Sequence, residues 1–157
     1  MRKIIILSLL IIISLFIVTG CDNKKIEPSN QNNGQPENNI NNSNEVISQV
    51  KVIINNKEYT LNLEDNETAK KFASLLPQEL NMSELNGNEK YIYLDSTLPT
   101  NSSNPKYINA GDVMLYGNNC LVIFYKSFET SYSYTKIGHI DNLDKLGSGS
   151  ITVIFEK

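Results

Sequence analysis

Hydrophobic and polar positions alternate with a period of two over most of the chain beyond residue 45. Between Val50 and Glu64, apolar residues occupy alternate positions on both sides of the pair Asn55-Asn56. Alternate side chains of a strand share a face, and asparagine tolerates a positive φ, so this stretch predicts a β-hairpin. Further strands are expected at residues 79–85, 89–94, 113–117, 120–125, 135–140 and 151–155.

The period changes once, after the hairpin. Apolar residues recur at helical spacing from Ala69 to Leu76, behind a candidate N-cap at Asp65 or Asn66. This spacing predicts a helix that ends before Pro77, because proline cannot continue it. A second, short helix is expected from Asp141, with Asp144 also in its first turn.

The strand candidates dominate the pattern and define the expected fold class. The runs on either side of Gly117-Asn118-Asn119 alternate weakly, which is typical of strands buried on both faces. The polar stretch 95–106 is too long for a hairpin turn and is either functional or mobile. About eight strands with one or two helices predict a mainly β fold, a small closed barrel, because closure leaves no exposed edge.

The first 21 residues resemble a bacterial lipoprotein signal. Arg2 and Lys3 precede an apolar run of about 15 residues, which closes on "VTGC". These four residues resemble a lipobox, which implies cleavage after residue 20 and a lipid on the Cys21 thiol. The predicted location is the cell membrane, lipid-anchored, facing the outside of the cytoplasm. The alternative is an uncleaved membrane anchor that contains an incidental cysteine.

Residues 21–45 are dominated by asparagine, with few large apolar side chains. Such a composition cannot bury enough surface to offset the entropy of ordering, so it predicts a disordered tether after the lipidated cysteine. A binding tail is the alternative. The expected organisation is a signal peptide at 1–20, the tether at 21–45 and one folded domain at 46–157.

Charge and composition exclude several kinds of partner. Removal of Arg2 and Lys3 with the signal reduces the 14 basic residues to 12, against 17 acidic ones, a formal charge of −5. The mature chain has no arginine, so nucleic-acid binding is not expected. One histidine and one remaining cysteine, Cys120, make no metal-ligand cluster, and no cofactor is expected. Cys120 lies in an apolar run and is expected to be buried.

The order of elements and several short motifs resemble the cyclophilin family, most closely its short bacterial cyclophilin-like members. The motifs are Gly111-Asp112, Gly117-Asn118-Asn119, Phe124-Tyr125 and Ile137-Gly138-His139-Ile140. The resemblance implies a closed barrel with a binding face for peptides. It does not carry over the isomerase residues, because the mature chain lacks the family's arginine and tryptophan. Tyr91-Ile92-Tyr93 stands where the family has Phe-His-Arg.

The remaining chemistry favours binding over catalysis. His139 is the only histidine, so any nucleophile would have to use it, and Lys90, interpreted as a rim residue, does not replace a guanidinium. No catalytic residue is therefore assigned. The candidate groove for a peptide or small ligand comprises Tyr91, Tyr93, Met114, Tyr116, Phe124 and His139. Two hypotheses remain: a non-catalytic binding module, or a prolyl isomerase or other enzyme using the same face.

Overall fold

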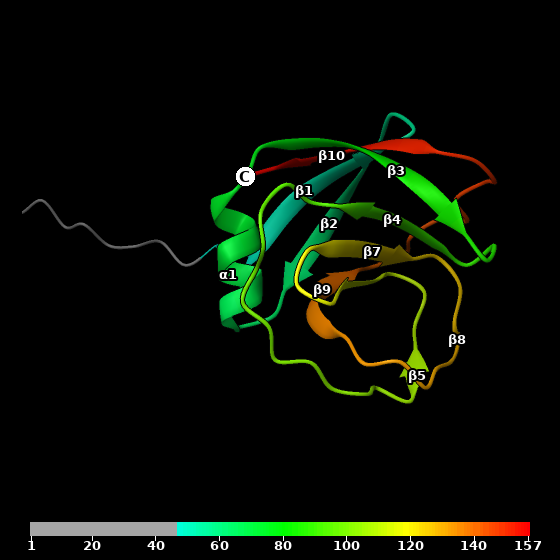
Figure 1. The fold of residues 1–157 in the computed structure, drawn as a ribbon. Helices are drawn as coiled ribbons and strands as arrows, with labels where there is room; N and C mark the ends of the chain where they lie inside the picture. Colours follow the sequence, from blue (N-terminus) through cyan, green and yellow to red (C-terminus); the bar gives the residue numbers. More distant parts are fainter. Residues whose placement is uncertain (1–46) are drawn as a thin grey trace, which may run out of the picture. The chain divides into compact units, whose positions relative to one another are not determined.

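The computed structural model describes residues 47–157, so the expected signal peptide, Cys21 and the tether lie outside the described residues. Within 47–157, eight strands close an antiparallel barrel and a single helix lies at one end of it (Figure 1). Two short strands pair with each other in a lobe outside the barrel. The predicted mainly β fold with a closed eight-stranded barrel is confirmed.

The elements follow one another in a simple order. They are β1 (Gln49–Ile54), β2 (Lys57–Leu63), α1 (Glu67–Ser74), β3 (Gln78–Leu85), β4 (Glu89–Tyr93), β5 (Tyr107–Ile108), β6 (Asp112–Tyr116), β7 (Cys120–Phe124), β8 (Phe128–Glu129), β9 (Thr135–Ile140) and β10 (Ile151–Glu156). Around the barrel the strands neighbour one another in the order β1-β10-β3-β4-β7-β6-β9-β2, and β5 pairs with β8. The pair β5–β8 was not predicted, because two-residue strands carry no detectable period.

The β1–β2 hairpin forms as its turn residues predict. Asn55 and Asn56 have φ values of 50° and 62°. Two consecutive positive φ angles give a turn whose twist matches that of the strands, and asparagine adopts them at little cost. The register that follows places Val52 opposite Tyr59.

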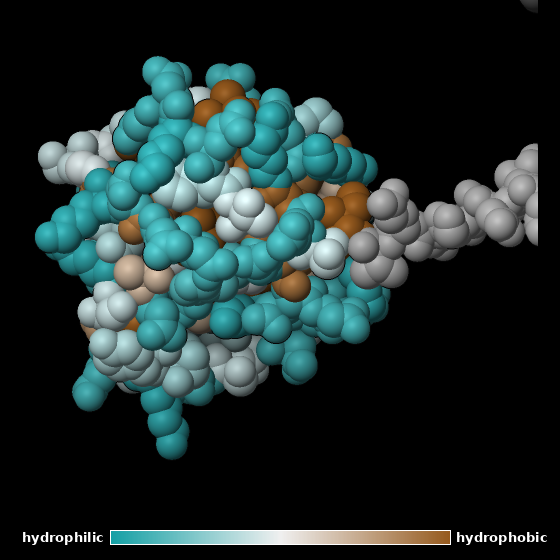
Figure 2. All heavy atoms as spheres, turned by 180° about the vertical axis from the view of Figure 1, so that it is seen from behind, coloured by the Kyte–Doolittle hydropathy of each residue, from teal (hydrophilic) through white to brown (hydrophobic). Residues whose placement is uncertain are grey.

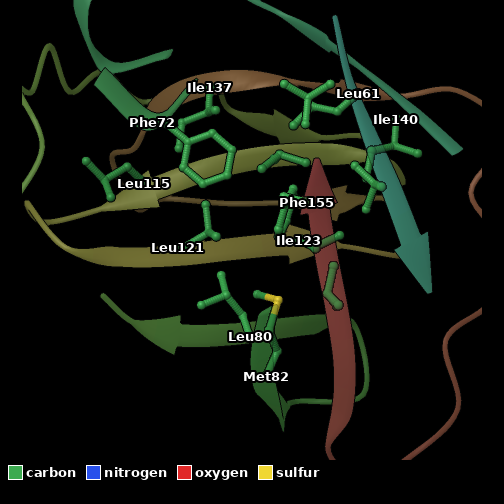
Figure 3. Packing of buried hydrophobic residues seen from close by; sticks show 14 of the residues in the cluster. Leu61, Phe72, Leu80, Met82, Leu115, Leu121, Ile123, Ile137, Ile140 and Phe155 are labelled. Atoms are coloured by element: carbon green, nitrogen blue, oxygen red, sulfur yellow. The ribbon is translucent and has the colours of Figure 1, made fainter. Parts of the chain in front are cut away.

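Helix α1 begins at the asparagine of the two candidate caps. The side-chain oxygen of Asn66 accepts a hydrogen bond from the Ala69 backbone N–H at 2.8 Å, whereas Asp65 forms an ion pair with Lys70. The buried face of the helix carries Phe72, whose ring stands edge-on to that of Phe155 with centroids 5.2 Å apart. The helix therefore covers one end of the barrel, and its Phe72 ring packs against Phe155 of β10 in the core (Figure 3).

Hydrophobic residues are buried on both sides of the sheet in β6 and β7. Inside the barrel, Leu115, Leu121 and Ile123 belong to the same core cluster as Phe72 and Phe155 (Figure 3). On the outer side of the sheet lies a smaller group, the outer cluster: Ile108, Met114, Cys120, Val122, Phe124 and Tyr134. The lobe of β5 and β8 covers part of this group, which explains why β6 and β7 show little alternation. The face seen in Figure 2 is mainly hydrophilic, with hydrophobic residues in separate patches.

The second helix predicted from Asp141 is wrong, because residues 141–150 form turns and irregular backbone. The acidic side chains that suggested a helical first turn are instead bound by strand β2. Asp144 accepts hydrogen bonds from Lys57 at 2.7 Å and Tyr59 at 3.0 Å, and Asp141 accepts one from Asn62 at 2.9 Å.

Within the described part of the chain, no helix has the length and apolar character needed to cross a membrane.

Candidate functional site

Strand β4 presents two chemically different faces. Lys90 and Ile92 point into the barrel, whereas Glu89, Tyr91 and Tyr93 share the opposite, outer face, as the period of a strand requires. The outer face continues across β7 to Cys120 and Val122. The sheet therefore supplies a floor of small apolar side chains beside a row of tyrosines.

A concave site lies on this outer face, and we call it the tyrosine hollow. It has a volume of about 290 Å³. Its lining residues are Leu85, Asn86, Glu89, Tyr91, Tyr93, Tyr116, Cys120, Val122, Tyr132 and Tyr134. The rings of Tyr91 and Tyr93 stand edge-on, with their centroids 6.1 Å apart. The ring centroid of Tyr116 lies 6.1 Å from that of Tyr132 and 5.6 Å from that of Tyr134. Two aromatic groups therefore face the same space from different elements.

The structure brings together some of the sequence-predicted groove residues and separates others. Tyr91, Tyr93 and Tyr116 line the tyrosine hollow, whereas Met114 and Phe124 are buried in the outer cluster. His139 is not among the residues that line the hollow. Glu89 was missed, although its even spacing from Tyr91 and Tyr93 places it on their face of β4.

Exposed apolar side chains concentrate at the hollow. Among residues 47–157, five large hydrophobic side chains are exposed: Leu85, Tyr93, Tyr107, Tyr116 and Tyr132. All but Tyr107 line the tyrosine hollow. Exposed apolar side chains that gather around a concavity are typical of an interaction site, whereas scattered ones need no explanation.

Glu89 is the charged group of the hollow. It is only 9% exposed, and within residues 47–157 its carboxylate is influenced by burial and the like charge of Glu84 but by no hydrogen bond or cation. Burial, followed by the negative charge of Glu84, raises the pKa of Glu89 above its ordinary value of 4.5. A largely buried carboxylate without a hydrogen-bond or ion-pair partner is unusual in a folded protein.

The cysteine of the hollow is not an activated nucleophile. Cys120 is buried, as expected from the sequence, and burial raises the pKa of its thiol above 9.0. Reactive cysteines instead have a lowered pKa that yields thiolate at neutral pH. Cys120 therefore acts as a small apolar residue of the floor.

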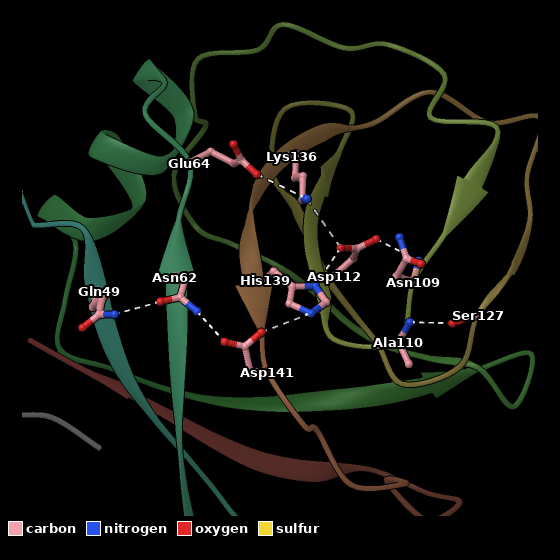
Figure 4. Close-up of polar contacts among 10 residues, drawn as sticks. All are labelled: Gln49, Asn62, Glu64, Asn109, Ala110, Asp112, Ser127, Lys136, His139 and Asp141. Carbon is pink, nitrogen blue, oxygen red and sulfur yellow. Dashed lines mark hydrogen bonds and ion pairs between the residues drawn. The ribbon is translucent and has the colours of Figure 1, made fainter.

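His139 belongs to a separate polar network that joins β6 and β9 (Figure 4). Its Nδ1 lies 3.0 Å from Oδ1 of Asp112, and the other oxygen of Asp112 accepts the Asn109 backbone N–H at 2.8 Å. The Nε2 atom lies 3.7 Å from the Asp141 carboxylate. In the described range no hydroxyl or thiol is hydrogen-bonded to this ring, so the pair lacks the nucleophile of a catalytic triad.

Gly111 makes this network possible. Its φ is +99°, and a Cβ at this position would lie 2.2 Å from the carbonyl oxygen of Ile140 and 2.9 Å from Cε1 of His139. Only glycine therefore allows the backbone before Asp112 to approach β9 this closely. The contact explains the Gly-Asp pair as a packing requirement of the strand junction.

The interpretation of Lys90 as a rim residue is wrong. Its side chain is fully buried, and its ammonium group donates to Glu84 and to the carbonyl oxygens of Gly147 at 2.6 Å and Gly149 at 2.7 Å. Tyr125 donates to the other oxygen of Glu84 at 2.6 Å. The loop that covers Lys90 is 57 to 59 residues away in sequence. Only tertiary structure could reveal that cover.

A second hollow, of about 520 Å³, lies beside the β1–β2 hairpin and includes Tyr59. Two of its lysines already have acidic partners, Lys57 with Asp144 at 2.7 Å and Lys51 with Glu156 at 2.5 Å. It is larger than the tyrosine hollow but shallower and richer in charged side chains. The described residues contain no group of three or more His, Cys, Asp or Glu side chains that would hold a metal ion.

Comparison with known proteins places the barrel in a family. No curated protein and no solved structure matches the chain. The family model described as the cyclophilin-like family matches residues 52–156, from within β1 to the end of β10. This chain is therefore a member of the cyclophilin-like family.

Proposed function

We propose that this protein is a lipoprotein held at the outer face of a cell membrane by lipid on Cys21, and that its cyclophilin-like barrel is a non-catalytic binding module. The observation that carries the binding role is the tyrosine hollow, with its exposed rings and its unpartnered Glu89. The membrane location rests on the apolar run and the "VTGC" motif of the sequence.

The lining of the hollow suits binding. A tyrosine side chain offers a large apolar body and a polar tip, and it loses little conformational entropy when a ligand contacts it. A volume of about 290 Å³ lies just below the usual range for pockets that hold drug-sized ligands. The site therefore fits one side chain of a peptide or one small head group rather than a large cofactor.

The geometry gives little support for isomerase chemistry. Rotation about a prolyl bond has a barrier of about 20 kcal/mol, and lowering it requires a positioned donor beside the twisting amide. The mature chain has no arginine to supply a fixed guanidinium fork. The ammonium of Lys90 is enclosed by Glu84 and two backbone carbonyls, so it cannot take that place.

The binding role is tested by selecting a displayed random peptide library on the full chain in a non-ionic detergent. We expect selected peptides to lose at least about tenfold in affinity, or 1.4 kcal/mol, when Tyr93 and Tyr116 are both changed to alanine. Tyr107→Ala is the matched control, because Tyr107 is 51% exposed and lies outside the hollow. Peptides that bind all three proteins equally would refute the hollow as the binding site.

The anchor is tested by metabolic labelling with a radioactive fatty acid. Cys21→Ser should abolish the label and leave the precursor uncleaved, whereas Cys120→Ser, which changes the other cysteine of the chain, should keep the label. If the wild-type protein carries no lipid and partitions into detergent exactly as the Cys21→Ser variant does, the anchor proposal fails.

The enzyme alternative is tested with a proline-switch peptide assay and a normal cyclophilin as the positive control. We expect the full chain to leave the rate at its uncatalysed value, because neither the guanidinium nor a tryptophan is available. Acceleration by the wild-type protein that disappears in Tyr93→Ala would instead establish an enzyme that uses the tyrosine hollow.

A further inference from the structure

The two buried acidic residues of the barrel differ in a way that points to a ligand. Among residues 47–157, the buried acids are Asp112, 2% exposed, and Glu89, 9% exposed. Asp112 receives the Asn109 backbone N–H and lies 3.0 Å from the His139 ring. Within the described range, Glu89 has no hydrogen-bond donor and no basic side chain as a partner. The fold therefore satisfies one buried carboxylate and leaves the other open toward the tyrosine hollow.

The surroundings of Glu89 do not supply the missing positive charge. None of the residues that line the hollow is a lysine, and the nearest buried cation along the strand, Lys90, points to the other side of the sheet and is bound by Glu84. Burial and the charge of Glu84 raise the pKa of Glu89. A cation in the hollow would stabilise the ionised carboxylate and remove this penalty.

The tyrosines of the hollow favour the same kind of occupant. An aromatic ring carries negative charge on its face and attracts a cation placed within about 6 Å of its centroid. Five tyrosines from β4, β6 and the segment before β9 line the hollow around one carboxylate. Several tyrosine rings that line one hollow together with a single acid suit a positively charged head group better than an anion or a sugar.

Extending the proposed function, on which this inference rests, we infer that the tyrosine hollow binds an organic ammonium group. The charge lies against the Glu89 carboxylate, and the attached methyl or methylene groups lie against the rings of Tyr91, Tyr93 and Tyr116. The volume of about 290 Å³ admits one such head group. Both a lysine side chain of a peptide and a trimethylammonium group, as in choline, have this chemistry.

The test is calorimetric titration of the full chain in a non-ionic detergent with two matched pairs of probes. Choline is compared with 3,3-dimethyl-1-butanol, which has the same shape but no charge, and N-acetyl-lysine methylamide with the norleucine analogue. We expect the charged member of at least one pair to bind about tenfold more tightly than its neutral partner. The pair that shows this preference identifies the source of the ammonium group.

Variants assign the preference to the hollow. Glu89→Gln should lower the affinity for the charged probe about tenfold and abolish the preference over the neutral probe. Glu79→Gln, at an exposed position of β3 outside the hollow, is the matched control and should leave both unchanged. Tyr93→Leu should weaken the charged probe more than Tyr93→Phe, which keeps the ring; Tyr93 is 64% exposed, so neither change disturbs the core.

The outcomes separate this inference from the proposed function. Equal affinity for charged and neutral probes, with both weakened by Tyr93→Leu, overturns the ammonium inference and leaves the hollow as a binding site. A preference for the charged probes that survives Glu89→Gln also overturns it. Absence of binding by all four probes overturns the inference, and the peptide selection described above then decides the proposed function separately.

Discussion

Two neighbouring residues of β4, Glu89 and Lys90, carry opposite charges and have opposite surroundings. Lys90 is fully buried on the inner side of the sheet, where a carboxylate and two carbonyl oxygens accept its protons. Glu89 is nearly as buried on the outer side, where no residue of the described range pairs with it. On the inner face of β4 the buried charge is paired, whereas on the outer face it is not.

The difference separates a structural role from a functional one. The Lys90 network joins β3, β4 and the loop before β10, so its polar groups are satisfied within the fold. The Glu89 carboxylate contributes no such link, and its desolvation opposes folding. Residues that lower stability without a structural compensation are found most often where a protein binds something.

The largest effect on this comparison is expected for Lys90→Met, which keeps the length of the side chain and removes its charge. The Glu84 carboxylate and two carbonyls lose their common donor, so the free energy of unfolding should fall by about 3–5 kcal/mol. Urea denaturation measures this change. Lys51→Met, which breaks an exposed ion pair with Glu156, is the control and should alter stability far less, because solvent screens that pair.

An equal effect of the two lysine substitutions would mean that the inner network contributes little. The inner face of β4 would then differ from the outer face in geometry but not in energy.

A smaller effect is expected for Tyr125→Phe. The loss of its hydrogen bond to Glu84 should reduce stability by about 1 kcal/mol at neutral pH. Burial, and then the hydrogen bond to Glu84, raises the pKa of Tyr125 from 10.0 to about 12. The folded state thus keeps this proton when the unfolded chain loses it, so the wild-type protein should lose stability as the pH rises from about 10 to about 12.

Tyr125→Phe should lack this alkaline component. Parallel denaturation curves of the two proteins at several pH values above 9 check the difference. If the gap between them stays constant throughout, the phenol is not held in its neutral form by the fold.

The smallest effect, of opposite sign, is expected for Glu89→Gln. A raised pKa means that the folded state binds the proton more tightly, so ionisation of Glu89 lowers stability as the pH rises through the folded pKa, above 4.5. The glutamine variant has no such loss. At pH 7 its melting temperature should equal or exceed that of the wild type, whereas at pH 4 it should be lower. A variant that is clearly destabilised at pH 7 would show that Glu89 has a structural partner.

Much of the barrel could be predicted from the sequence because its signals are local. Alternation located the strands, and Asn55-Asn56 specified a turn that needs two positive φ angles. The helix also followed from local spacing, and the choice of Asn66 as its cap needed the structure. The expected helix at Asp141 failed because partners on β2, about 80 residues away, bind the acids that suggested it.

The chemistry of the site was harder to predict because it depends on which residues cover each face. The tyrosines of β4 were recognised, but nothing in the sequence near Lys90 indicates that the carbonyls of Gly147 and Gly149 enclose it. Glu89 could have been placed beside the tyrosines by the period of the strand alone. Its lack of a partner is a property of the folded chain that no local pattern contains.

The central claim, that the outer face of β4 binds the ligand, is tested most directly by NMR of the full chain with ¹³C-labelled tyrosine rings. The chain has eight tyrosines and no tryptophan. Tyr91, Tyr93, Tyr116, Tyr132 and Tyr134 line the hollow, whereas Tyr59, Tyr107 and Tyr125 lie elsewhere and serve as internal controls. On titration with choline or the lysine probe, we predict saturable shifts of the first group only. Shifts centred on Tyr59, in the second hollow, or no shifts at all would contradict the account.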